Sequence, residues 1–161
     1  MPTGLRAEIK QDKPFATLEQ EALLGVERTA AVLGRALARV LEPYGLTPTQ
    51  YNALRILRGA GAAGLCRYEV TERLVTPVPD VTRLLDRLED AGHVVRARDG
   101  ADRRLVTARL TPAGRRLVDE LDAVVAAFER DTLGTFGARD LRALIALLDR
   151  ARAVVSETAT A

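Results

Sequence analysis

The stretch DVTRLLDRLEDAGHVVRAR, residues 80–98, carries two hydrophobic periodicities that meet at a glycine. Four apolar residues of its first part recur at the spacing of one helix face: Val81, Leu84, Leu85 and Leu88. This spacing predicts a helix that begins at about Asp80, buries these four side chains and ends at Gly92 in the left-handed conformation. Residues 94–98 then alternate with period two, so the helix is expected to lead directly into a strand.

A β-hairpin is expected after this helix. Asp99-Gly100 is a turn signal, and Leu105 to Leu110 alternates again, which predicts a second strand and a loop at residues 99–104. Arg103 and Arg104 fall in that loop, where a guanidinium can enter a narrow, electronegative minor groove. The order of elements, two short helices followed by a basic hairpin, is typical of DNA-binding winged helices.

Helices are predicted on both sides of this region. Apolar residues at three- and four-residue steps predict a long helix over residues 18–41, and Thr47, Pro48 and Gln50 form a start signal with a capping box for the next helix. A short helix fits residues 66–75, with Leu65, Val70 and Leu74 turned inward, and it ends before Pro77 and Pro79. Thr111-Pro112 opens another long helix, and a last helix follows the break at residues 134–137.

The composition and motifs of the sequence do not predict a catalytic or metal-binding site. Apolar residues make up 47% and charged residues 29% of 161 residues, as in globular proteins. The only cysteine, Cys66, and the only histidine, His93, have no partner motif for nucleophilic catalysis or metal binding, so neither an enzyme nor a cofactor is expected. No intramolecular disulfide, membrane segment or signal peptide is predicted, which favours the cytoplasm.

The charge distribution indicates a polyanionic partner. Seven arginines and two aspartates lie between residues 93 and 116, whereas from Leu117 onward five arginines face eight carboxylates. The predicted helix at residue 80 turns a polar face outward, with its N-terminus toward phosphate. We therefore expect seven residues to contact double-stranded DNA: Arg67, Asp80, Thr82, Arg83, Arg87, Arg103 and Arg104. The alternative for Arg83 and Arg87 is a solvated helix face, paired with Asp86 and Asp90.

Three segments in order resemble the MarR family of bacterial transcriptional regulators: residues 80–96, Asp102-Arg-Arg104, and Leu110-Thr-Pro-Ala-Gly114. The resemblance covers about residues 46–114. It implies that the helix bearing Thr82 and Arg83 is the recognition helix, and that Asp102 braces the wing arginine Arg104. The family usually has a glycine and a small polar cap between the two helices, where this chain has Val75-Thr-Pro-Val-Pro79.

The expected fold class is mostly α with a small β-hairpin wing (α+β), a winged helix-turn-helix with long N- and C-terminal dimerisation helices. Its parts are a flexible tail (1–15), a dimerisation helix (16–44), the DNA-binding lobe (46–114) and C-terminal dimerisation helices (112–157). The resemblance implies a homodimer that binds a palindromic operator, and we expect a repressor that a small-molecule effector releases from DNA.

The resemblance also implies an effector site for aromatic acids or other lipophilic molecules between the dimerisation helices and the DNA-binding lobe, where Tyr44 and Tyr51 are candidate pocket residues. Their alternative is a place in the core. Two other functions remain open. The first is a redox-responsive repressor that acts through Cys66, although Cys66 can equally be a small apolar residue without a redox role. The second is a winged helix that contacts only proteins.

Overall fold

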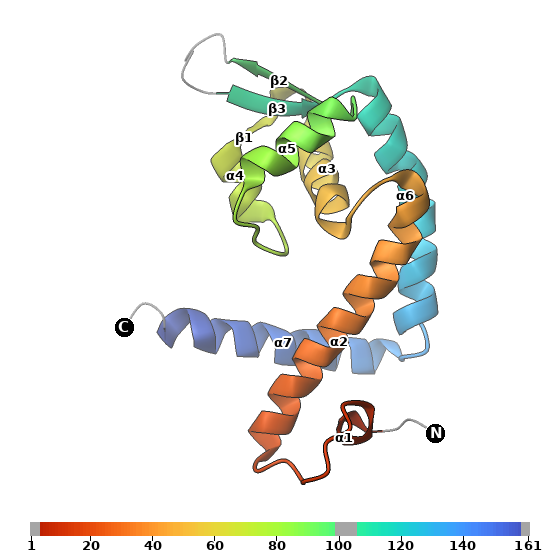
Figure 1. Ribbon diagram of the computed structural model, residues 1–161, viewed down its shortest axis with the longest axis vertical. Helices are drawn as coiled ribbons and strands as arrows, with labels where there is room; N and C mark the ends of the chain where they lie inside the picture. Colours follow the sequence, from red (N-terminus) through yellow and green to blue (C-terminus); the bar gives the residue numbers. More distant parts are fainter. Residues whose placement is uncertain (1–3, 99–105, 159–161) are drawn as a thin grey trace. The chain divides into compact units, whose positions relative to one another are not determined.

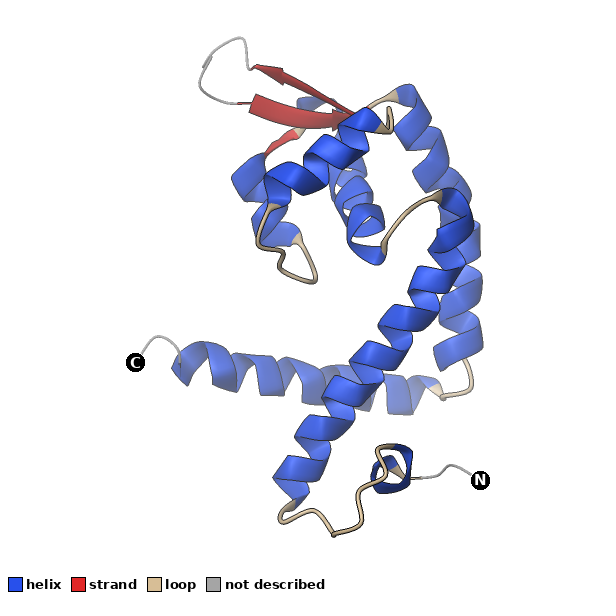
Figure 2. Cartoon of the chain, in the orientation of Figure 1, coloured by secondary structure: helices blue, strands red, loops and turns tan. Residues whose placement is uncertain are grey.

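The computed structural model describes residues 4–98 and 106–158, and it divides the chain into two compact units, Met1–Val118 and Asp119–Ala161 (Figure 1). The expected wing loop, with Asp102, Arg103 and Arg104, therefore lies outside the described residues. The fold class is confirmed: helices dominate, and a small antiparallel sheet is the only strand structure in the described part of the chain (Figure 2).

The first unit begins with a short segment that contacts the first long helix. Residues 5–8 form α1 (Leu5–Glu8), where the sequence predicted a tail, and α2 (Leu18–Leu41) follows. Leu5 approaches Gly25 of α2, and Arg28 Nε lies 3.4 Å from Glu8 Oε2. These are contacts between segments distant in sequence, which local periodicity does not reveal.

The helix α2 has the predicted boundaries, and its start is set by local chemistry. Thr17 Oγ1 accepts a hydrogen bond from the Gln20 amide, which satisfies one of the free N–H groups of the first turn. A short 3-10 segment, η1 (Glu42–Tyr44), extends α2 and ends at Gly45, whose φ of +68° favours glycine. Much of α2 is exposed, including Leu18 at 82%.

Four helical segments build the lobe that follows. They are α3 (Pro48–Ala60), η2 (Gly61–Ala63), α4 (Arg67–Arg73) and α5 (Val81–Asp90). The capping box predicted for α3 is present: Thr47 Oγ1 accepts from the Gln50 amide, and Gln50 Oε1 accepts from the Thr47 amide. Gly92 has a φ of +74° after α5, as predicted.

The helix α4 is shorter than predicted, because its expected first residue belongs to a strand. Leu65–Cys66 forms β1, which pairs antiparallel with β3 (Val106–Leu110), and β3 pairs with β2 (Val94–Arg98). The sheet order is β1-β3-β2. In the register, Cys66 lies opposite Thr107 and Arg96 lies opposite Ala108, so β3 links the start of α4 to the strand that follows α5.

The core of the lobe is aliphatic and comes from every one of its longer elements. Leu54 and Leu57 of α3, Val70 of α4, Leu88 of α5 and Val94 of β2 are fully or almost fully buried. Leu84, predicted to be buried, is only half-buried, since it lies at the edge of the apolar stripe of α5. A stripe of this kind orients α5 with its polar face outward.

The second unit consists of most of α6 (Pro112–Leu133) and α7 (Ala138–Thr158). The break between the two helices falls at residues 134–137, as predicted. Several apolar side chains of α7 are exposed, among them Ile145 at 59%. No helix in the described ranges combines the length and the apolar character that a membrane span requires.

Candidate nucleic-acid interface

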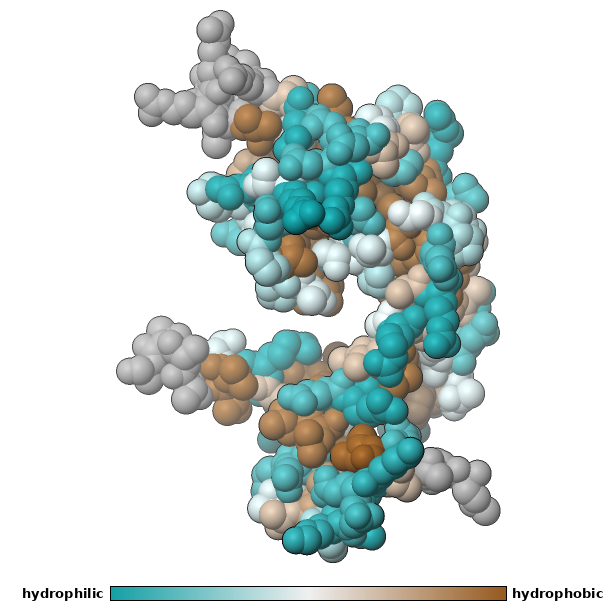
Figure 3. Space-filling view, in the orientation of Figure 1, coloured by the Kyte–Doolittle hydropathy of each residue, from teal (hydrophilic) through white to brown (hydrophobic). Residues whose placement is uncertain are grey.

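The polar face of α5 presents a row of side chains to solvent. Thr82, Arg83 and Arg87 are all exposed, while Val81, Leu85 and Leu88 on the opposite face are buried. Figure 3 shows hydrophilic surface over α5. A helix with one buried face and one exposed polar face has the width and the chemistry to enter a major groove.

Asp80 has a structural role that sequence analysis did not assign. Its Oδ1 accepts a hydrogen bond from the Arg83 amide at 2.9 Å, so it is the N-cap of α5. A carboxylate at this position stabilises the first turn and interacts favourably with the helix dipole. The structure therefore supports Asp80 as a residue that shapes the interface.

The acidic residue expected to neutralise Arg83 has another partner. Asp86 Oδ1 lies 2.6 Å from Arg96 Nη2, and Arg96 also contacts Glu89. Within the described residues the Arg83 and Arg87 side chains have no ion pair or hydrogen bond. The solvated face with paired charges is therefore not the arrangement observed, and both guanidiniums remain available to a ligand.

Arg67 joins this surface from a different helix, and it is packed on an aromatic ring that sequence analysis missed. Its guanidinium carbon lies 4.6 Å from the centre of the Tyr68 ring, and Tyr68 is 67% exposed. Such a cation–π contact restricts the guanidinium before any ligand binds. The signal in the sequence was an aromatic residue next to an arginine at a helix start.

A hollow of about 440 Å³ lies beside this surface, and its lining includes Arg67, Tyr68 and Thr82. The remaining lining residues come from β1, α5, β2 and β3: Cys66, Leu85, Arg96, Val106 and Ala108. The hollow thus lies beside predicted DNA-contacting residues of both α4 and α5. Its volume falls in the range of small-molecule sites.

Cys66 is half-buried, and its backbone is committed to the start of α4. Its amide donates a hydrogen bond of 2.8 Å to Glu69 Oε2. This bond holds the pKa of the Glu69 carboxyl below its ordinary value, so the carboxylate remains charged at the helix start.

The turn between α4 and α5 is held from the side by α3. The Val75 amide, in the turn after α4, donates a hydrogen bond of 2.9 Å to Asn52 Oδ1 of α3. Pro77 and Pro79 have no amide hydrogen to contribute to such bonding. A side chain of α3 thus replaces part of the local bonding that a glycine turn would supply.

The two tyrosines suggested as pocket residues are not brought together around a hollow. Tyr51 is buried in the core, and Arg55 lies over its ring at 5.9 Å, while Tyr44 is half-buried in η1. Four hollows of about 300 to 480 Å³ occur in the described part of the chain, and neither tyrosine lines any of these four.

Comparison with known proteins identifies the chain. A model of the MarR family matches residues 44–105. The HTH-type transcriptional regulator PecS of Dickeya dadantii is 30% identical over 143 residues, which cover 88% of this chain and 86% of PecS. The HTH-type transcriptional repressor Rv2887 of Mycobacterium tuberculosis is 31% identical over 135 residues, 83% of this chain and 96% of that protein. The chain belongs to the MarR family.

Among solved structures, this MarR family chain is similar to BpsR of Bordetella bronchiseptica. The TM-score is 0.75 with 25% identity, and the match covers 87% of this chain and 98% of BpsR. The segment that matches the family model contains α3, α4, α5 and β2, which carry the exposed surface described above. The segment that matches the family model therefore includes the described part of the candidate interface.

Proposed function

We propose that this MarR family chain is a homodimeric, sequence-specific regulator that binds double-stranded DNA as a repressor and is released by a small-molecule effector. The observation that carries the proposal is the exposed face of α5, where Arg83 and Arg87 have no protein partner within the described residues. Arg83 lies in the first turn of α5 and Arg87 in its last turn, so two uncompensated guanidiniums are spread along one exposed helix face, an arrangement that suits phosphates and base edges. A surface for protein contact alone has no need of them.

Apolar side chains left exposed on both long terminal regions support the dimer. On α2 they are Leu18, Leu23, Val26 and Val32, and on α7 they are Leu144, Ile145, Leu147, Val154 and Val155. Figure 3 shows apolar surface over part of α2. Patches of this kind are unusual on a monomer, and a second copy would cover both.

The hollow beside Arg67 and Thr82 supports control by an effector. It combines an apolar floor with arginines, which suits an aromatic acid. The DNA binding of BpsR is regulated by 6-hydroxynicotinic acid, a molecule of this class. A ligand in this hollow would compete for residues that we assign to DNA.

The test is selection of duplexes by the purified protein from a random-sequence library, followed by titration of the selected duplex. We expect a palindromic site and an affinity that falls steeply with salt, because each phosphate contact releases a counterion. A protein that selects no sequence, or whose affinity is insensitive to salt, would contradict the proposal. A monomer in sedimentation would contradict its dimeric part.

Two arginine variants separate the two groove-reading elements. Arg83→Ala should cost about 1 to 3 kcal/mol on the selected site and relax the preference at one position per half-site. Arg104 lies outside the described residues, and from its place in the sequence we propose that it enters the minor groove, so Arg104→Ala should weaken binding to all sequences. Asp102→Ala should weaken binding slightly, whereas a purely electrostatic wing predicts tighter binding.

A further inference from the structure

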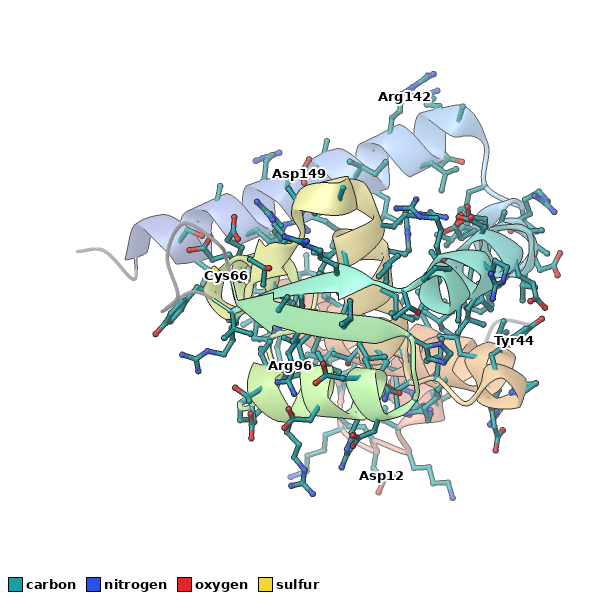
Figure 4. All side chains as sticks on the ribbon, turned by 90° about the horizontal axis from the view of Figure 1, so that it is seen from above. Asp12, Tyr44, Cys66, Arg96, Arg142 and Asp149 are labelled. Carbon is teal, nitrogen blue, oxygen red and sulfur yellow. The ribbon has the colours of Figure 1, made fainter. Side chains whose placement is uncertain are left out.

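Arg96 of β2 connects the proposed wing to the proposed recognition helix through two carboxylates of α5. Its amide donates to Glu89 Oε1 at 2.9 Å, and its guanidinium contacts Glu89 Oε2 through Nε at 2.8 Å and through Nη2 at 2.6 Å. The same Nη2 lies 2.6 Å from Asp86 Oδ1. Figure 4 shows Arg96 between β2 and α5. We call Arg96, Glu89 and Asp86 the α5–β2 clamp.

The clamp has more contacts and is less exposed than an ordinary surface ion pair. Glu89 uses both carboxylate oxygens, and the Arg96 side chain is only 26% exposed. Hydrogen bonds from Arg96 hold the pKa of Glu89 below its ordinary value, and the two carboxylates raise the pKa of Arg96. A fork of this geometry fixes the direction of a guanidinium, which a single ammonium contact does not.

The position of the clamp gives it a consequence for DNA binding. The helix α5 carries Thr82, Arg83 and Arg87, and β2 is an edge strand whose hydrogen-bonded neighbour in the described sheet is β3 alone. The clamp is the polar connection between α5 and the outer side of the wing strand. Two elements that read one DNA site together bind well only when their relative position is fixed beforehand.

We propose that Arg96, Glu89 and Asp86 act as positioning residues that hold the wing at the spacing from α5 that a specific site requires, without contacting DNA themselves. This inference rests on the proposed DNA-binding function. This proposal and a purely electrostatic model predict opposite changes in DNA affinity when Glu89 is removed. A carboxylate near DNA repels phosphate, so removal of Glu89 should tighten binding unless the carboxylate positions another element.

The experiment compares Glu89→Ala with Asp90→Ala, two losses of one carboxylate from adjacent positions of α5. Within the described residues the Asp90 side chain has no ion pair or hydrogen bond. On the duplex that the wild type selects, Glu89→Ala should weaken binding about tenfold, while Asp90→Ala should bind as wild type or more tightly. Arg96→Ala should match Glu89→Ala, and the double variant should lose no more than either, because both remove the same connection.

Three further measurements keep the test independent of folding and of the proposed function. Binding to a scrambled duplex of equal length should change little in Glu89→Ala, and Glu89→Gln, which preserves side-chain volume, should show a smaller loss on the selected duplex. In the free protein, exchange of the Arg96 amide should accelerate in Glu89→Ala and not in Asp90→Ala. Unchanged or tighter specific binding by Glu89→Ala overturns the clamp while DNA binding stands. A wild type that binds no duplex overturns the proposed function, and equal amide exchange in all variants then overturns the clamp itself.

Discussion

Replacement of Gly114 by alanine should destabilise the lobe, although alanine is the better helix residue. Gly114 lies in the first turn of α6, and its amide donates to Thr111 Oγ1 at 3.0 Å. A Cβ at this position would lie 2.9 Å from the carbonyl carbon of His93 and 3.1 Å from its Cα, and closer still to the carbonyl oxygen. Real Cβ atoms essentially never approach backbone atoms so closely.

The obstacle is backbone, which a rotamer change cannot move. His93 O accepts from the Thr111 amide at 3.0 Å, and Thr111 Oγ1 donates to Gly92 O at 2.7 Å, so the two chain segments are bonded to each other around Gly114. An added Cβ would force these two segments apart, and such overpacking costs about 1 to 3 kcal/mol of stability. It exceeds the gain of about 0.5 to 1 kcal/mol that alanine brings to an open helix position.

Gly59→Ala is the matched control, because nothing lies within 4 Å of a Cβ built at Gly59 in α3. Urea unfolding at one fixed protein concentration should show a lower free energy of unfolding for Gly114→Ala and an equal or higher one for Gly59→Ala. If both variants were equally stabilised, the close approach of α6 to His93 would be refuted.

Three further results are expected. Asp80→Ala should lower the free energy of unfolding by about 0.5 to 2 kcal/mol in urea titration and Asp80→Asn should not, because asparagine also caps helices; equal losses would contradict the capping role. Hydrogen bonds from Arg96 lower the pKa of Glu89, so the stability of the wild type should fall as the pH drops through that lowered pKa. In Glu89→Gln the melting temperature should depend less on pH in the acid range. An identical pH dependence in both proteins would contradict the hydrogen bonds between Arg96 and Glu89. Arg28→Ala should leave the melting temperature unchanged, since its pair with Glu8 is exposed, and a large decrease would mean that this contact holds the N-terminal segment.

Features determined by neighbouring residues were predictable from the sequence. The capping box of Thr47 and Gln50, the left-handed Gly92 and the boundaries of α2 all follow from residues within a turn of each other. The exposed face of α5 followed from one helix period.

Features that depend on distant partners were not predictable. The strand β1 has only two residues and exists because Leu65 and Cys66 pair with β3. The helix α1 is too short to form from propensity alone, and the contact of Leu5 with Gly25 accompanies it. The alternative interpretation of the α5 face paired Asp86 with an arginine of its own helix, whereas the structure pairs it with Arg96 of β2, a contact that helix periodicity does not reveal.

The two faces of α5 separate the residues that hold the fold from the residues to which we assign DNA contact, and this separation determines which substitutions can change the target of the regulator. Val81, Leu85 and Leu88 fix the helix in the lobe, and Asp80 fixes its first turn. Thr82, Arg83 and Arg87, which we propose contact DNA, have neither task, so substitutions at these three exposed positions leave the core unchanged. Under the proposed function, a change of DNA target therefore needs only a few codons within a single helix.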